Sequence, residues 1–394
     1  MNREDFLYFE NNPNIIYFDN AATTKNKPTE VIDAVVNAMK NFGNSSRGVH
    51  EESLSADRIV FETRKKIAKM FNVGNFRQVV FTKNVTESLN IAINGLFSVN
   101  DHIITSVAEH NSVLRPIHYL KEKGVEVSYI GVLENGVINF DEIPSLIKAN
   151  TKAIIVTHAS NVTGNITDLK KYGDFCKANN LLFVVDASQT AGAFNIDMQE
   201  MNIDVLCFTG HKSMLGPQGT GALCVREEVY IRPFMVGGSG THSYDEFQPD
   251  KMPTRLEAGT LNSHGIAGLH ASIDYILRNK MENLTNKSLE IARKFYDGVT
   301  KFPEVKVYGD FETEFRAPIV SLNISDMDSS EVSSILYEDY KISTRPGAHC
   351  APLIHKALGT VEQGMVRFSF SHSNTFDEVE LAINAIKKII DDRR

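Results

Sequence analysis

Short apolar runs alternate with segments of helical period along the first two thirds of the chain. Seven runs rich in β-branched residues predict strands at 79–82, 102–106, 125–132, 153–158, 181–188, 205–211 and 221–226. Amphipathic helices fit between most of them, for example at 86–97, 112–123 and 168–179. This alternation predicts an α/β fold whose large domain has a mainly parallel seven-stranded sheet between helices.

The pattern changes after about residue 265. A long helical pattern covers 265–302, and strand candidates follow in VKVYG, PIVSLNIS and MVRFSFS before a terminal helix that starts at Phe376. A chain of 394 residues has room for two domains. We therefore expect a large domain over 20–264, and a smaller α+β C-terminal domain formed by 1–19 and 265–394.

Composition narrows the range of partners. Apolar residues make up 42% of the chain and charged residues 23%, which is typical of a globular protein. The formal net charge of -8 offers no general attraction to nucleic acid or to an anionic membrane surface. No basic leader with a long apolar run opens the sequence, and no run is long enough to span a bilayer. We expect a cytoplasmic protein without nucleic-acid or membrane partners.

The four cysteines are Cys176, Cys207, Cys224 and Cys350. Their wide spacing without a CxxC pair argues against a disulfide framework and against a zinc site, so no metal is predicted. The first three lie in apolar or helical segments and are expected to be small buried residues. Cys350 lies between turn-forming residues beside His349, with Arg345 nearby, and sequence context alone leaves a reactive thiolate and an inert loop cysteine equally open.

Polar residues follow several predicted strands, and ligands of open α/β sheets bind at the carboxyl ends of the strands. Lys212 stands in FTGHKSMLGPQGTG after the strand at 205–211. It could be a Schiff-base amine, although a lone lysine in such a loop is more often solvated. Asp186 ends the strand in VVDASQ, where it could pair with a protonated pyridine nitrogen or cap a helix.

Two further segments fit a planar, phosphate-bearing cofactor. The turn into the helix at 86–97 leaves free N–H groups around Asn84 to Glu87, a stretch that includes Val85 and Thr86, and this suits a phosphate. The turn lacks P-loop glycines, however, and Thr86 as a plain N-cap is as probable. His110, in AEHN after the strand at 102–106, could stack on a cofactor ring and exchange protons, or could be an ordinary loop histidine.

Eight motifs occur in this order: FDNAATT, NVTESLN, AEHN, THASNVTG, VVDASQ, FTGHK, EAGT and RPGAHCAP. In these motifs the chain resembles the cysteine desulfurases and selenocysteine lyases, class V aminotransferases that use pyridoxal 5'-phosphate (PLP) and have the PLP-dependent transferase fold type I. The resemblance extends over nearly the whole chain.

The resemblance implies a role for each matching residue. Lys212 would carry PLP as a Schiff base, Asp186 would pair with the pyridine nitrogen, Gln189 would bond the ring hydroxyl, and His110 would stack on the ring. The phosphate would be held by a group of residues from two subunits of a homodimer: Val85, Thr86, Thr209, His211 and, from the second subunit, Thr260. The substrate would be bound by Asn161, Arg345, His349 and Arg367, of which Arg367 can fork onto the carboxylate.

The implied reaction removes sulfur from L-cysteine. Lys212 would take the Cα proton, Cys350 would attack the sulfur and become a persulfide, and His110 would donate a proton before L-alanine leaves. The loop between Cys350 and Arg367 is short, which favours a dedicated sulfur-acceptor protein or L-selenocysteine as substrate. Ala348 and Ser46 each stand where this group typically has a histidine.

Three alternatives remain at this point. The chain could be a selenocysteine lyase, or a class V aminotransferase or C-S lyase in which Cys350 is incidental. It could also be a catalytically silent interaction protein that keeps the fold.

Overall fold

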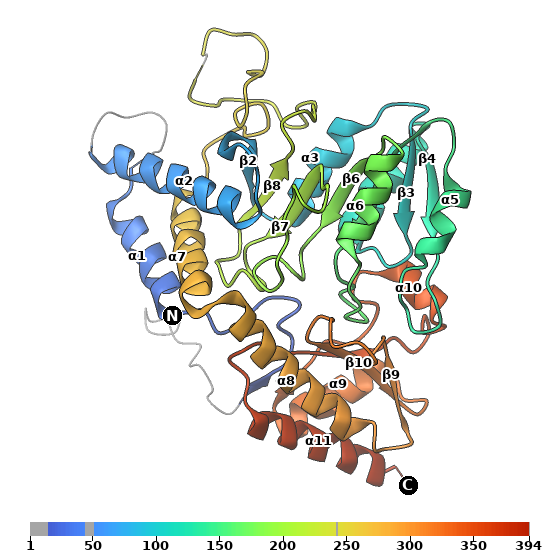
Figure 1. Ribbon diagram of the computed structural model, residues 1–394. Coiled ribbons are helices and arrows are strands. Elements are labelled where there is room, and N and C mark those ends of the chain that lie inside the picture. Colours follow the sequence, from blue (N-terminus) through green and yellow to red (C-terminus); the bar gives the residue numbers. More distant parts are fainter. Residues whose placement is uncertain (1–14, 44–50, 242, 394) are drawn as a thin grey trace, which may run out of the picture.

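The central sheet of the computed structural model, which describes residues 15–43, 51–241 and 243–393, has the strand order β2-β8-β7-β6-β5-β3-β4 (Figure 1). In that order the strands are Val79–Thr82, Gly221–Val225, Val205–Thr209, Leu182–Asp186, Thr151–Thr157, His102–Ser106 and Glu126–Ile130. The predicted seven-stranded, mostly parallel sheet is confirmed. Strand β8 is antiparallel to both of its neighbours. It runs back because no helix lies between β7 and β8 to carry the chain over the sheet.

Helices cover both faces of this sheet because successive strand residues point to opposite sides. Ile104 and Phe183 lie in one core with α2 (Glu51–Met70), α6 (Leu169–Ala178) and α7 (Ser263–Asn279). Their sequence neighbours Ile103 and Val184 lie in a second core with α3 (Val85–Leu96) and α4 (Asn111–Glu122). The remaining helices of this part are α1 (Thr29–Asn41), which packs on α7, and the short α5 (Ile143–Leu146).

A smaller sheet, β12-β10-β9, lies below the central sheet in Figure 1. Its strands are Val366–Ser369, Ile319–Ile324 and Val305–Tyr308. Its helices are α8 (Met281–Val299), α9 (Ser329–Tyr340) and α11 (Phe376–Asp391). The helical pattern predicted at 265–302 forms two helices, α7 and α8, separated at Lys280, whose φ of 59° ends the first one.

The N-terminal strand β1 (Ile16–Tyr17) joins this smaller unit by pairing in parallel with β11 (Ile342–Ser343). Phe18 lies in the same core as Phe295 and Phe368, whereas the buried side chains of α7 belong to the core of the large sheet. Residues 1–14 of the predicted 1–19 segment lie outside the described residues, and the domain boundaries stay a prediction. No helix in the described part of the chain has the length and apolarity needed to cross a membrane.

Candidate active site

Lys212 lies in the loop that follows β7. Its backbone oxygen accepts hydrogen bonds from the Thr24 hydroxyl at 3.0 Å and from the Leu215 N–H at 2.8 Å. Its Nζ makes no hydrogen bond or ion pair with any described residue. Burial lowers the pKa of this amine from 10.5 to about 8, against the opposing effect of Asp186. A substantial fraction of Lys212 is therefore neutral, and nucleophilic, near pH 8.

Asp186 is the last residue of β6 and is buried. Its Oδ1 accepts the Ser188 N–H at 2.9 Å and the Ser188 hydroxyl, while Oδ2 bonds no described residue. Burial raises the pKa of this carboxyl, and the Ser188 bonds and Lys212 counteract that effect. Gln189, three residues on, is fixed by an Nε2 bond to Ala21 O at 3.2 Å. One carboxylate oxygen is thus held by the protein and one is left for a cationic partner.

The start of α3 offers an anion site. Asn84, not Thr86, is the N-cap, and its side chain accepts the Glu87 N–H at 3.0 Å. The N–H groups of Val85 and Thr86 have no partner in the described part of the chain. The Thr86 hydroxyl bonds the Ser112 hydroxyl at 2.8 Å, so α3 and α4 meet here.

His110 caps α4 through its ring. Its Nδ1 accepts the Ser112 N–H at 3.0 Å, and because an amide can only donate, the ring proton of neutral His110 lies on Nε2. Burial and the charge of Lys212 lower the pKa of His110 to about 4. His110 is therefore a neutral ring with an N–H donor at Nε2 near neutral pH.

The other predicted phosphate ligands divide into two places. Thr209 is the last residue of β7 and His211 directly precedes Lys212, with His211 Nδ1 3.1 Å from the Thr23 hydroxyl. Thr260 is exposed and lines a separate cavity of about 170 Å³ beside Arg64 and Glu257. No hydrogen bond or ion pair joins Thr260 to the Lys212 loop among the described residues.

Cys350 is the exposed one of the four cysteines, and Cys176, Cys207 and Cys224 are buried as predicted. His349 and Cys350 have φ values of 50° and 57°, in the left-handed region that such residues rarely adopt. The backbone oxygen of Cys350 accepts the Asn111 N–H at 2.7 Å. That of His349 accepts the Asn161 side-chain amide at 2.8 Å. The first bond ties the cysteine loop to the segment that carries His110, and the second ties it to the loop that follows β5.

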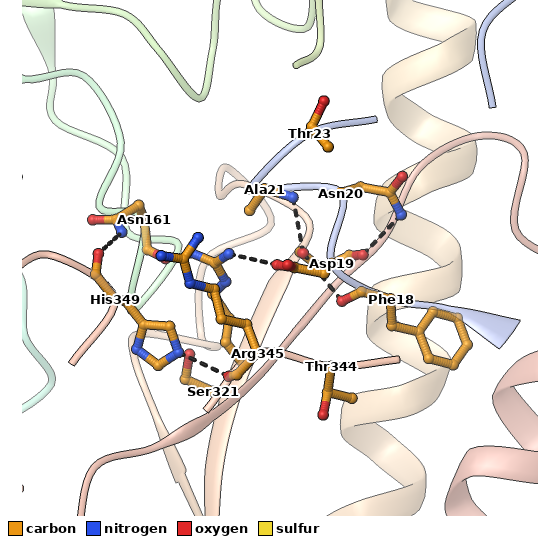
Figure 2. Close-up of polar contacts among 12 residues, drawn as sticks. Phe18, Asp19, Asn20, Ala21, Thr23, Asn161, Ser321, Thr344, Arg345 and His349 are labelled. Carbon is orange, nitrogen blue, oxygen red and sulfur yellow. Dashed lines mark hydrogen bonds and ion pairs between the residues drawn. The ribbon is translucent and has the colours of Figure 1, made fainter. Parts of the chain in front are cut away.

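Two arginines lie beside this loop. Arg345 Nη2 is 3.9 Å from Cys350 Sγ. Arg367 lies opposite Arg345 in a backbone bridge and is almost fully buried. Its Nη1 donates to Asn161 O at 3.0 Å, and its Nη2 pairs with Asp19 Oδ1 at 2.7 Å. Figure 2 shows Asp19, Asn161, Arg345 and His349 gathered in this part of the site.

Comparison with known proteins identifies the family. The model of the class-V aminotransferases matches residues 16–381. The chain belongs to the class-V aminotransferase family. A probable cysteine desulfurase of Methanothermobacter thermautotrophicus is 34% identical over 381 residues, covering 95% of this chain and 94% of the relative. The cysteine desulfurase of Haloferax volcanii is 30% identical, covering 94% and 88%.

Solved structures of this aminotransferase family agree with the fold. The apo cysteine desulfurase of Thermococcus onnurineus superimposes with a TM-score of 0.90 at 34% identity, covering 96% of this chain and 95% of that one. The fold and the family inferred from the sequence motifs are thus confirmed.

Within this class-V aminotransferase, the structure places Lys212, Asp186, His110 and the α3 N-terminus after or at the carboxyl ends of β7, β6, β3 and β2, along one edge of the sheet. It also brings Asn161, Arg345, His349 and Arg367 to the Cys350 loop. Sequence reasoning missed Asp19, which stands in the FDNAATT motif, and Ser112, which stands two residues after His110. Ser46 lies outside the described residues.

Proposed function

We propose that this chain is a PLP-dependent cysteine desulfurase that moves the sulfur of L-cysteine onto Cys350 and releases L-alanine. One observation carries the proposal: Arg345 Nη2 lies 3.9 Å from Cys350 Sγ, and Arg345 is also among the charges that add to the effect of burial in lowering the pKa of Lys212. A single guanidinium thus links an activated amine and an exposed thiol. A plain aminotransferase has no need of a thiol at this place.

The residues present fit PLP. The unbonded Lys212 amine suits an aldehyde, and the unbonded Asp186 Oδ2 suits a protonated pyridine nitrogen. The free N–H groups of Val85 and Thr86 suit a phosphate, with Thr209 and His211 as further candidates. When bound, PLP supplies an electron sink for the bonds around the substrate Cα.

Lys212 moves the substrate Cα proton in this proposal. Its pKa of about 8 leaves it able to accept a proton near neutral pH, which an ordinary lysine with a pKa of 10.5 does poorly. His110 Nε2–H offers a hydrogen bond to the reacting groups, because Nδ1 is committed to the Ser112 N–H and a neutral imidazole does not release its Nε2 proton. Lys212, which carries a proton once it has taken one from Cα, is the residue that can return a proton to carbon.

Cys350 is the sulfur-accepting group. Its thiolate attacks the substrate sulfur, an S–S bond forms, and the C–S bond breaks with its electron pair leaving on carbon. That carbon is protonated and departs as L-alanine, so L-cysteine and Cys350-SH become L-alanine and Cys350-SSH. Arg345 Nη2 lies 3.9 Å from Cys350 Sγ, the atom that forms the new bond.

Arg367, with Arg345 across the backbone bridge from it, recognises the substrate in this proposal. Arg367 binds the substrate carboxylate, with Asn161 and His349 forming the adjoining wall. Burial of the guanidinium strengthens such an interaction because little water competes for it.

A homodimer completes the site in this proposal. Thr260 is exposed and separate from the Lys212 loop, which fits a role in the partner subunit's site. The helix α1 also exposes Ile32, Val36 and Met39 at helical spacing, an apolar stripe suited to a second copy.

Exposure of Cys350 suits transfer of the sulfur to an acceptor protein. A cytoplasmic location belongs to the same proposal.

The test measures alanine and sulfide release from L-cysteine, with a reducing thiol present, for the wild type and for Cys350→Ala. Cys350→Ala should lower turnover of L-cysteine by about a thousandfold or more, as expected for loss of a nucleophile. Undiminished desulfurase turnover would show that Cys350 is incidental. L-Selenocysteine, assayed in parallel, identifies a selenocysteine lyase, whose activity would survive the same substitution.

The cofactor anchor is tested separately. Borohydride reduction of the PLP-loaded protein, followed by peptide mass mapping, should place the label on Lys212. Lys27 is the matched control, because burial lowers its pKa to about 8 as well, but its Nζ is bonded to His211 O at 2.8 Å. Label on Lys27, or a protein that stays colourless with PLP, would contradict the proposal.

A further inference from the structure

Arg367 is held by two protein acceptors although almost none of it is exposed. Its Nη1 donates to the backbone oxygen of Asn161 at 3.0 Å, and Nη2 donates to Asp19 Oδ1 at 2.7 Å. Its Nε is buried and has no partner in the described chain. Of the four Nη hydrogens, the two acceptors take two, so two remain for a ligand.

Asp19 is the one carboxylate that pairs with Arg367 among the described residues. It follows β1 and forms a bridge with Ser369, two residues along β12 from Arg367. Phe18 O accepts the Ser369 N–H at 2.7 Å, so the backbone around Asp19 is tied to the strand that carries the arginine. The position of the Asp19 carboxylate relative to Arg367 is thus fixed by the sheet.

The charge of Asp19 also matters here. Burial lowers the pKa of Arg367, and Asp19 counteracts that effect. Arg345, which lies directly across the backbone bridge, adds to the lowering. Without Asp19, a buried guanidinium would face a second cation with only a neutral carbonyl as partner. A buried charge that has lost its partner moves or recruits water.

We propose that Asp19 is a positioning residue that determines recognition of the substrate's free α-carboxylate, by holding Arg367 at Nη2 while Asn161 O holds it at Nη1. This role rests on the proposed function, in which Arg367 binds the carboxylate. Asp19 does not touch the substrate, because an anion at this place repels another anion. It fixes the plane of the guanidinium, and the two remaining Nη hydrogens with it.

The chemical class follows from the geometry. A guanidinium held in one plane favours a planar carboxylate with two oxygens over an ester or amide, which offers one good acceptor and no charge. The substrate is therefore an α-amino acid with a free carboxylate, and Asp19 contributes to that preference through Arg367.

The test compares Asp19→Ala and Asp19→Asn with the wild type, using L-cysteine and L-cysteine methyl ester. Asp19→Ala should raise KM for L-cysteine about tenfold or more, with kcat changed much less and KM for the ester nearly unaltered. Asp19→Asn keeps an oxygen that can accept from Nη2, so it should restore part of the loss and raise KM only about threefold.

Asp297→Ala is the matched control, because Asp297 pairs with Arg293 at 3.0 Å on the exposed face of α8. It should leave KM unchanged. The positioning role is overturned if Asp19→Ala lowers KM for L-cysteine, which would mean that Asp19 competes with the substrate. It is also overturned if L-cysteine and the ester change by the same factor.

A binding readout separates this inference from the proposed function. L-Alanine and L-alanine methyl ester are titrated into the PLP-loaded protein, and the change in its visible absorption gives both Kd values without any turnover. If the wild type binds L-alanine but does not remove sulfur from L-cysteine, the proposed function is refuted. A selective loss of affinity for L-alanine in the variants would then still support the positioning role of Asp19. If the variants bind L-alanine as tightly as the wild type does, the positioning role of Asp19 is refuted, whereas the proposed desulfurase function is not affected. Should Asp19→Ala not take up PLP, Asp19→Asn carries the same comparison.

Discussion

The rate at which the apoprotein reacts with PLP should titrate with Lys212. Its pKa is lowered from 10.5 to about 8, chiefly by burial, a difference worth about 3 kcal/mol. At pH 7 about one tenth of the amine is then neutral, against about one part in 3000 for an ordinary lysine. The protein thus holds roughly 300 times more of the reactive form at this pH.

Stopped-flow absorbance under excess PLP measures this directly. The rate constant should rise with pH, bend near pH 8 and then level off, because further deprotonation adds no more nucleophile. Asp186→Asn should move the bend to lower pH by about one unit, since the carboxylate favours the charged amine. Arg345→Gln should move it upward, since that guanidinium disfavours the charge.

These opposite signs make the reasoning refutable. A bend near pH 10.5 would show that Lys212 is solvated and not activated. Shifts of the same sign in both variants would show that general unfolding, and not local charge, controls the rate. Exposed Lys170→Ala serves as the control and should leave the profile in place.

Three further predictions concern Glu109, Ser112 and Phe295. Burial raises the pKa of Glu109 to about 8, so its contribution to stability is complete below about pH 4.5 and is lost as pH rises through 8. In urea unfolding, the free energy of unfolding of Glu109→Gln should lack that part of the pH dependence. A free energy that changes with pH as steeply as in the wild type would contradict the prediction. Ser112→Ala removes the hydroxyl between His110 and Thr86 and should weaken PLP binding about tenfold in an absorbance titration. Phe295→Ala empties a site in the smaller core and should cost about 3 to 5 kcal/mol in chemical denaturation, and a loss under 1 would mean the core collapses.

The sequence predicts the sheet well because its strands are buried and bounded by polar loops. The runs at 79–82 and 102–106 coincide with β2 and β3. The apolar pattern does not predict that β8 is antiparallel to its neighbours, because a strand that is buried on both faces has the same sequence pattern in either direction. The break at Lys280 is equally hidden, because the apolar period continues from α7 into α8.

The same logic explains the site. Lys212, Asp186 and His110 could be found because each follows an apolar strand, and strand ends gather at one edge of a parallel sheet. Asp19 could not be found that way, because its partner Arg367 is 348 residues distant and only the folded chain joins them. Ser112 was hidden for a similar reason, since its bond to Thr86 connects two helices. Of the two roles left open for Thr86, the N-cap is wrong, because Asn84, two residues earlier, caps the helix.

The exposed position of the cysteine loop affects how long a sulfur atom bound to Cys350 would persist. Asn111 and Asn161 hold the backbone of the loop, and Cys350 faces solvent. In the proposed reaction, the terminal sulfur atom on Cys350 would lie on this exposed loop, where dissolved thiols and oxidants meet it as readily as a protein acceptor does. How long the sulfur survives is then decided by the redox state of the surrounding solution.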